Sequence, residues 1–195
     1  MTNSKGKTTR RVELLKAARG IFAEKGYEAT TVSEIVTRAG VAQGTFYLYF
    51  PSKVSIAVEL AGEVQEKIKA AILEAYAHTK KPEEWINKSI QAAFDITGQY
   101  RDVLGVVHSS IPWSEHPRER ERIFSPYYDL ISDLLEREKV RGNVSPHLNT
   151  RITATLIVGL VYYAIDECYL YDVHTAREIY IEETMRFIRH AMGIR

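Results

Sequence analysis

Hydrophobic residues recur along most of the chain at the three- and four-residue spacing that is typical of amphipathic helices. One such stripe near the N-terminus consists of Val12, Leu15, Ala18 and Phe22. No segment alternates apolar and polar residues in the way that a half-buried strand does. The sequence therefore predicts an all-α fold.

Turn and capping signals divide this pattern into about nine helices. Gly26, Gly40 and Pro51 are expected to end the first three, because glycine favours a helix C-terminus and proline cannot continue a helix. Thr31-Val32-Ser33-Glu34 has the composition of a capping box at the start of the second helix. The predicted helices cover residues 9–25, 31–39, 42–49, 53–79 and 82–100, then a short helix to 111, a loop at 112–117, and helices at 118–140, 148–171 and 174–192.

The second and third helices are joined by the short turn Gly40-Val41-Ala42, which is the arrangement of a helix-turn-helix. The first helix is expected to pack across both. We expect residues 1–55 to form a helix-turn-helix DNA-binding domain with a basic N-terminal arm, and residues 56–195 to form a larger helical domain.

The third helix is unusually aromatic, and helical spacing separates its rings into two sets. Phe46 and Phe50 share a face that would pack on the first two helices. Gln43 and Tyr47 share the opposite face, which is free to meet a partner. The alternative for all of these rings is that they fill a small three-helix core, and we adopt that alternative for Phe46 and Phe50 only.

The outward face carries the chemistry that a DNA major groove selects. A glutamine such as Gln43 can make two hydrogen bonds to a base edge, and Gly44 permits close backbone approach. Thr45 and Tyr49 lie on a flank, where hydroxyl groups can bind phosphate oxygens together with Tyr47. Lys53, in the first turn of the fourth helix, is expected to add an ammonium contact to phosphate.

Charge supports an anionic partner at this end of the chain. Residues 1–55 hold nine Lys and Arg against four acids, a net charge of +5, whereas the whole chain has a net charge of +1. Double-stranded DNA is the expected partner. Lys5, Lys7 and Arg10 could add phosphate or minor-groove contacts, or could form a solvated tail.

Residues 9–57 resemble the tetracycline-repressor-like (TetR) family of bacterial regulators. The motifs F-A-E-K-G-Y, T-T-V-S-E-I, A-G-V, G-T-F-Y, Y-F and S-K occur in the order and spacing of that family. The resemblance implies DNA contacts from Thr31 and Ser33, and from the third-helix residues and the lysine already named. Two positions depart from the family pattern: Ala42 cannot cap the third helix as the family's serine does, and Val32 cannot read a base as the basic residue of some members does.

The resemblance also implies that the region beyond residue 56 binds a small-molecule effector. An aromatic pocket with an acid would suit a lipophilic molecule, including a cationic one. His108 and Trp113 lie in the region that the family uses for the pocket entrance. The alternative is that most of the aromatic rings in this region belong to the ordinary hydrophobic core. The candidate ligand-binding residues are Phe94, Tyr100, His108, Trp113, Tyr128, Tyr162 and Asp166.

Self-association follows from the small size of the reading helix. One short helix reads only a few base pairs, so a two-fold dimer is needed to read two half-sites. The last two helices are the expected interface, as the family also suggests, and the alternative is that their apolar faces form an intrachain core. The candidate interface residues are Leu156, Gly159, Leu160, Tyr163, Tyr180 and Phe187.

The remaining signals exclude other classes of protein. Cys168 is the only cysteine, which rules out an intramolecular disulfide and fits a reducing cytoplasm. The apolar run 154–165 is too short to span a bilayer, and no secretory signal precedes the first helix. We find no catalytic motif and expect no enzyme activity, cofactor or metal.

The sequence thus predicts a ligand-responsive transcriptional regulator that binds a palindromic operator as a homodimer and is released by a lipophilic or aromatic effector. We expect a repressor. The alternative is an activator or an architectural DNA-binding protein with no small-molecule effector.

Overall fold

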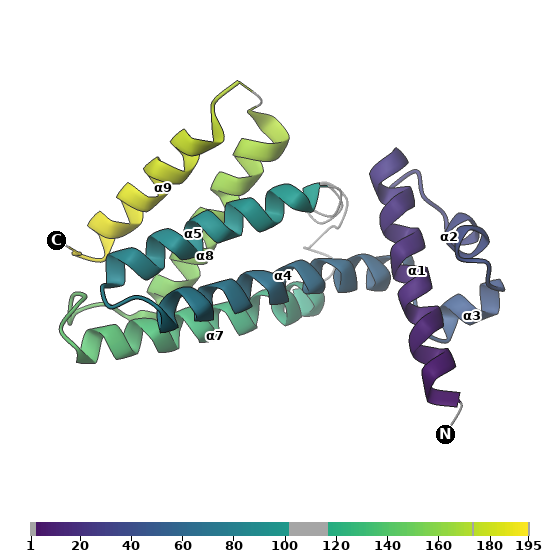
Figure 1. Cartoon of the computed structure of the whole chain (residues 1–195), viewed down its shortest axis with the longest axis horizontal. Helices are drawn as coiled ribbons and strands as arrows, with labels where there is room; N and C mark the ends of the chain where they lie inside the picture. The colour runs from purple at the N-terminus through teal and green to yellow at the C-terminus, as the bar shows by residue number, and fades with distance from the viewer. Residues whose placement is uncertain (1–2, 102–116, 173, 195) are drawn as a thin grey trace. The chain divides into compact units, whose positions relative to one another are not determined.

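The structure, a computed structural model, describes residues 3–101, 117–172 and 174–194. Within these ranges the chain forms eight α-helices and one π-helical turn, and no strand (Figure 1). The all-α prediction is confirmed. The short helix expected to reach residue 111 and the loop expected at 112–117 fall outside the described residues, apart from the last residue of that loop.

Most helix boundaries lie close to those that the sequence predicts. The elements are α1 (Asn3–Lys25), α2 (Val32–Ala39), α3 (Gln43–Tyr47), α4 (Lys53–Ala77), α5 (Pro82–Gln99), α7 (Pro117–Val140), α8 (Thr150–Asp166), the π-helical turn η1 (Glu167–Tyr171) and α9 (Arg177–Ala191). Two expectations were wrong. Helix α1 begins at Asn3 rather than at Thr9, and α3 is shorter than the predicted range 42–49.

The described residues group into two compact units. The first contains the chain up to Glu63 together with Tyr100, and the second contains Val64–Gln99 and the residues from Pro117 onward. Helix α4 begins in the first unit and continues into the second without a break. The expected domain boundary at residue 55 remains a prediction.

In the first unit, α1 packs against α2, and α2 packs against α3. The side chains of Leu14, Ile35 and Phe46 are fully buried in this small core. Their burial holds α1, α2 and α3 together, since hydrophobic burial supplies most of the favourable free energy of folding.

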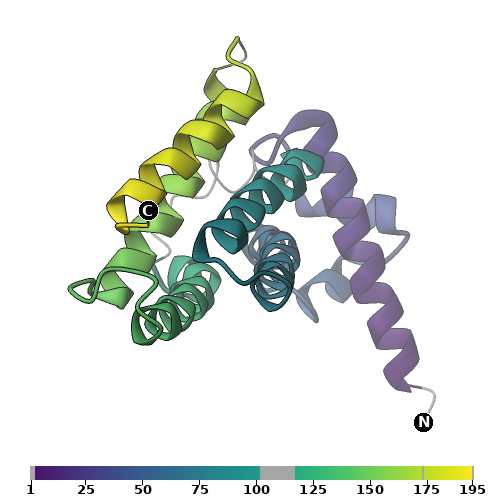
Figure 2. The same cartoon turned by 60° about the vertical axis from the view of Figure 1, so that its left-hand side comes forward.

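In the second unit, α8 contacts α7, α5 and α9, and α5 also packs along α9 (Figure 2). Phe94, Leu135 and Ile188 are almost completely buried between these helices. The hydroxyl of Tyr127 on α7 donates to the carbonyl oxygen of Gln65 on α4 at 3.0 Å. Burial raises the pKa of this tyrosine well above its ordinary value, which keeps the hydroxyl a donor.

A buried carboxylate links the ends of α4 and α7. Glu138 is only 2% exposed, and its two oxygens accept hydrogen bonds from the Tyr76 hydroxyl at 2.9 Å, Arg141 at 2.7 Å and Asn143 at 2.7 Å. A buried charge is costly unless it is paired and hydrogen-bonded. Here three donors meet that requirement, and they fix the C-terminal end of α7.

We predict that Glu138→Gln lowers the free energy of unfolding by about 1–3 kcal/mol, because charge-assisted hydrogen bonds are replaced by weaker ones and one donor loses its acceptor. Urea unfolding measures this loss. Glu136→Gln is the matched control, since Glu136 is exposed on the same helix. Equal unfolding midpoints for the two variants would contradict this account of Glu138.

Candidate nucleic-acid interface

The start of α2 is fixed by the capping box that the sequence predicts. The amide of Glu34 donates to the Thr31 hydroxyl oxygen at 3.3 Å, and the Thr31 amide donates to the Glu34 carboxylate at 2.9 Å. The Thr31 hydroxyl itself donates to the same carboxylate at 2.8 Å. Its proton therefore serves the helix cap, and the structure assigns Thr31 first to the geometry of α2.

The turn between α2 and α3 depends on a left-handed residue. Gly40 has φ +66°, a conformation that a residue with a side chain rarely adopts. Its amide donates to the Thr37 carbonyl oxygen at 3.2 Å, and the Val41 amide donates to the Val36 carbonyl oxygen at 3.0 Å. These bonds end α2 and turn the chain into α3 within three residues. Ala42 then occupies the N-cap of α3 without a side-chain cap, as its methyl group requires.

Helix α3 is anchored by the two phenylalanines that the sequence assigns to its inner face. Phe46 is 0% exposed and Phe50 is 1% exposed. Their ring centroids lie 5.7 Å apart. The prediction that these rings belong to the core is confirmed, and their burial decides which face of α3 points outward.

The outward face presents the residues expected to read DNA. Gln43 and Gly44 are exposed, and Tyr47 keeps 52% of its surface exposed. A methyl group built on Gly44 would meet no atom within 4 Å, so packing inside the chain does not require glycine at this position. Thr45 and Tyr49 are half-buried on the flanks, as their spacing predicts. Ser33 is exposed near the start of α2.

Leu48 is an outward-facing residue that the sequence reasoning missed. Its side chain is 81% exposed directly after Tyr47. Exposing a leucine side chain to water is unfavourable. On DNA, such an apolar side chain can contact the methyl group of thymine. Helical spacing contains the missed signal, because Leu48 lies four residues after Gly44 and so shares its face.

Lys53 differs most from the expected arrangement. Its ammonium nitrogen donates to the carbonyl oxygens of Tyr27 at 2.8 Å, Thr30 at 2.9 Å and Glu28 at 3.3 Å. It also lies 4.1 Å from the centroid of the Tyr27 ring. The expected phosphate contact is untested, but in this structure the ammonium group points into the turn between α1 and α2.

Part of the basic charge of the first unit is already neutralised locally. Arg38 makes two hydrogen bonds of 2.6 Å to the carboxylate of Glu24, and Lys25 pairs with Glu34. The hydrogen bond from Lys25 is the main cause that lowers the pKa of Glu34 to about 2, with smaller contributions from Thr31. The local field at α3 is therefore weaker than the count of basic residues suggests.

The aromatic ligand-binding candidates separate into small groups. Tyr128 stacks on Phe124 at 6.4 Å, and Tyr162 meets the same ring edge-on at 5.1 Å. Phe94 is fully buried and lies 6.3 Å from the ring of Tyr169. Asp166 is buried in the last turn of α8.

Tyr100 groups with the first unit instead, where the guanidinium of Arg19 lies 4.3 Å from its ring centroid. The assignment of Tyr100 to the ligand-binding residues stays a prediction. The other two candidates, His108 and Trp113, lie outside the described residues. Among the described residues, no group of three or more His, Cys, Asp and Glu side chains could hold a metal ion.

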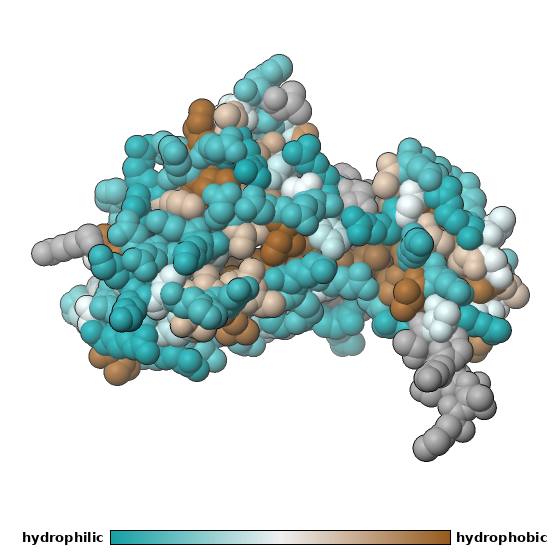
Figure 3. Space-filling view, viewed as in Figure 1, coloured by the Kyte–Doolittle hydropathy of each residue, from teal (hydrophilic) through white to brown (hydrophobic). Residues whose placement is uncertain are grey.

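The expected interface residues form an exposed apolar surface on α8 and α9. Leu156 is 68% exposed, Tyr163 63% and Phe187 64%. A methyl group built on Gly159 would meet open space. Ile152 and Ile179, which are also more than half exposed, extend the surface. Hydrophobic residues reach the surface at several places on the helical body in Figure 3.

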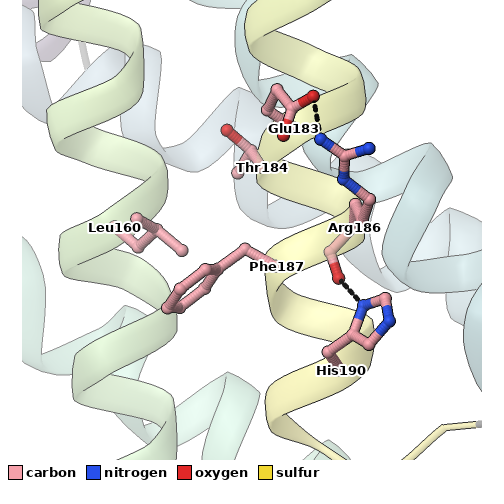
Figure 4. Close-up of a pocket in the computed structure, with 6 residues that line it drawn as sticks. All are labelled: Leu160, Glu183, Thr184, Arg186, Phe187 and His190. Atoms are coloured by element: carbon pink, nitrogen blue, oxygen red, sulfur yellow. Dashed lines mark hydrogen bonds and ion pairs between the residues drawn. The ribbon is translucent and has the colours of Figure 1, made fainter.

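The remaining two candidates are less accessible. Leu160 is half-buried, and the hydroxyl of the half-buried Tyr180 donates to Asp172 at 2.9 Å. Figure 4 shows Leu160 and Phe187 projecting toward each other from α8 and α9. With Glu183, Thr184, Arg186 and His190 they line a hollow of about 440 Å³.

Helix α8 together with η1 is the one stretch of the described residues that is long and apolar enough to cross a membrane. Thr150–Tyr171 spans 22 residues, and 22% of its most apolar window is buried. The apolar run 154–165 is only part of this helix, and the prediction that the run does not span a bilayer is unchanged. Length and composition alone are weak evidence for a membrane span, and the half-buried and buried acids Glu167 and Asp166 near its end argue against one.

The fold and the exposed reading face together define a helix-turn-helix DNA-binding protein. Residues 14–60 match the family described as bacterial regulatory proteins, tetR family. Residues 86–192 match the tetracyclin repressor-like C-terminal domain. The chain therefore belongs to the TetR family of transcriptional regulators.

Several known proteins are similar along nearly the whole chain. The HTH-type transcriptional regulator YvdT of Bacillus subtilis is 28% identical over 188 residues, which cover 93% of this chain and 94% of YvdT. FadR from Bacillus subtilis, whose crystal structure was solved in complex with stearoyl-CoA, is 21% identical in sequence. Its structure matches with a TM-score of 0.75 over 91% of this chain and 96% of the FadR chain. FadR from Thermus thermophilus, a TetR-family repressor solved in complex with lauroyl-CoA, is 19% identical in sequence. Its structure matches with a TM-score of 0.74 over 95% of this chain and 96% of that FadR chain.

Proposed function

We propose that this TetR-family regulator is a cytoplasmic repressor that binds a palindromic operator as a homodimer and is released by a lipophilic effector. One observation carries the DNA-binding part. Gln43, Gly44 and Tyr47 are exposed on α3, whereas Phe46 is buried and its ring meets the Tyr47 ring edge-on, with centroids 5.3 Å apart. A helix held in this way can enter a major groove about 12 Å wide with its polar face toward the bases.

The residues of this face divide into two roles. Gln43 reads a base edge, and the exposed Leu48 adds an apolar contact that favours thymine. The hydroxyl groups of Tyr47, Thr45 and Tyr49, with Ser33 at the start of α2, bind phosphate and set the register. Thr31 joins them mainly through the cap that fixes α2.

We predict that Gln43→Ala relaxes base preference at one position of each half-site, with a loss of about 1–3 kcal/mol of discrimination there. Tyr47→Phe should instead weaken binding by the same factor for every DNA sequence, because a phosphate contact carries no sequence information. Fluorescence anisotropy on fragments selected from the source genome, and on their single-base variants, measures both effects. Tyr171→Phe is the matched control, since Tyr171 is exposed on η1. Isotherms that are identical for all three variants and the unmodified chain would contradict these roles.

The apolar surface on α8 and α9 supports the dimer. Leu156, Tyr163 and Phe187 expose more than half of their surface, and several exposed large apolar residues on two packed helices favour a protein–protein contact. A two-fold axis through this surface would place the same residues of both copies against each other. Gly159 then allows α8 and its symmetry mate to approach closely.

We predict that Leu156→Glu converts the dimer to a monomer at micromolar concentration, because a charge would be buried in the centre of the interface. Operator binding should weaken in parallel. Sedimentation velocity measures the change in mass, and Leu73→Glu is the control, since Leu73 is 49% exposed on α4. A Leu156→Glu chain that remains a dimer would exclude this surface as the interface.

A long-chain acyl-CoA is the effector class that we infer. Two structural neighbours were solved with stearoyl-CoA or lauroyl-CoA bound, and the rings packed around Phe124 on α7 and α8 form an apolar cluster in the domain where we place the ligand. A ligand that binds one conformation of the dimer better than the other shifts the population toward it. A coupling of about 1–3 kcal/mol weakens operator binding by about 5–150-fold.

We predict that palmitoyl-CoA raises the melting temperature of the chain, whereas CoA alone does not. A ligand at 100 times its Kd stabilises the protein by about 2.7 kcal/mol. A thermal-shift series over acyl chain length, paired with operator binding in the presence of each compound, checks this. If no chain length changes either quantity, the effector class is wrong. The alternative, an activator or architectural protein without an effector, would then be favoured.

A further inference from the structure

The turn between α1 and α2 concentrates backbone carbonyl groups that the helices cannot satisfy. Helix α1 ends at Lys25, and Gly26 follows with φ +79°. The chain then turns through residues 27–30 before Thr31 caps α2. The carbonyl groups of residues 27, 28 and 30 lie between α1 and α2, outside the hydrogen-bond ladder of either helix, so they need other donors.

Lys53 supplies the donors for three of these carbonyl groups. Its ammonium group has three protons, and it lies 2.8, 3.3 and 2.9 Å from the oxygens of Tyr27, Glu28 and Thr30. These partners precede Lys53 by 23 to 26 residues. The bonds therefore join the first turn of α4 to the turn that precedes α2.

The surroundings of the ammonium group hold it in place. The ring of Tyr27 lies 4.1 Å from the nitrogen, which is within the range of a cation–π contact. Tyr27 is only 6% exposed and packs on Phe22 at 5.5 Å. Thr30, one of the three acceptors, is 1% exposed. Burial lowers the pKa of the Lys53 ammonium from its ordinary value.

We propose that Lys53 is a positioning residue that fixes the α1–α2 turn on α4 and does not bind phosphate. All three ammonium protons are used by carbonyl groups, so none is directed at a ligand. The tripod holds the residue before Thr31, and thereby the start of α2 and the orientation of α3. This proposal rests on the DNA-binding function proposed above only for its effect on operator affinity.

Two variants separate positioning from phosphate binding. Lys53→Met keeps the aliphatic stem but removes all three donors. Lys53→Arg keeps the charge, but its planar fork does not match a tripod of carbonyl oxygens, whereas it binds phosphate at least as well as lysine does. Lys80→Met is the matched control, since Lys80 is exposed in the loop between α4 and α5.

The first readout needs no DNA and uses the full chain alone. We expect Lys53→Met and Lys53→Arg each to lower the melting temperature by about 4 °C or more, while Lys80→Met leaves it unchanged. Hydrogen exchange of the Thr30 amide, which donates to the Tyr27 carbonyl oxygen at 3.1 Å, should accelerate in both Lys53 variants. If Lys53→Met does not fold, Lys53→Arg and the exchange rate still decide the question.

The second readout is the salt dependence of operator binding. A positioning role weakens binding at every salt concentration and leaves the slope of log K against log salt unchanged. Each lost phosphate contact would make that slope shallower by about 0.9. An unchanged melting temperature, a shallower slope, or full rescue of operator affinity by arginine would each overturn the proposal. If the chain binds no operator at all, the proposed function fails, while the melting and exchange measurements still test the role of Lys53.

Discussion

The reading face of this protein depends on the burial of two phenylalanine rings. A five-residue helix is far below the length at which an isolated helix is stable in water, so α3 exists because Phe46 and Phe50 are held in the core of the first unit. The same burial sets the rotation of α3 about its axis. With these rings inside, Gln43 and Gly44 are exposed, and Tyr47 keeps about half of its surface exposed while its ring contacts Phe46.

The elements around α3 serve that geometry. The capping box of Thr31 and Glu34 fixes where α2 begins, and the left-handed Gly40 fixes where it ends. The Lys53 ammonium group closes the turn before α2 from the side of α4. Helix α4 begins at this point in the first unit, and its residues from Val64 onward belong to the second unit.

The parts of the fold that sequence alone predicted well are those governed by local chemistry. The capping box spans four residues, from Thr31 to Glu34, and the helix end at Gly40 needs only one. The orientation of Phe46 and Phe50 follows from helical spacing. In each case the residues whose spacing makes the prediction lie within about one helical turn. They are also the residues that form the local structure.

The parts that could not be predicted are set by distant partners. The tripod of Lys53 joins residues more than twenty positions apart, and nothing near Lys53 in the sequence indicates it. Likewise, nothing near Tyr100 in the sequence indicates that the guanidinium of Arg19 lies 4.3 Å from its ring centroid; the ligand-binding role of Tyr100 stays a prediction. Helical spacing does predict the exposure of Leu48. A search for hydrogen-bonding side chains does not select it, because leucine is apolar.

The central claim is that the outer face of α3 lies in a major groove, and chemical protection of bound DNA tests it most directly. Dimethyl sulfate methylates guanine at N7, which faces the major groove, and adenine at N3, which faces the minor groove. On an operator fragment selected from the source genome, we expect protection of guanine N7 in two patches about one helical turn, or a multiple of it, apart. Protection confined to adenine N3, with every guanine N7 still reactive, would contradict the account.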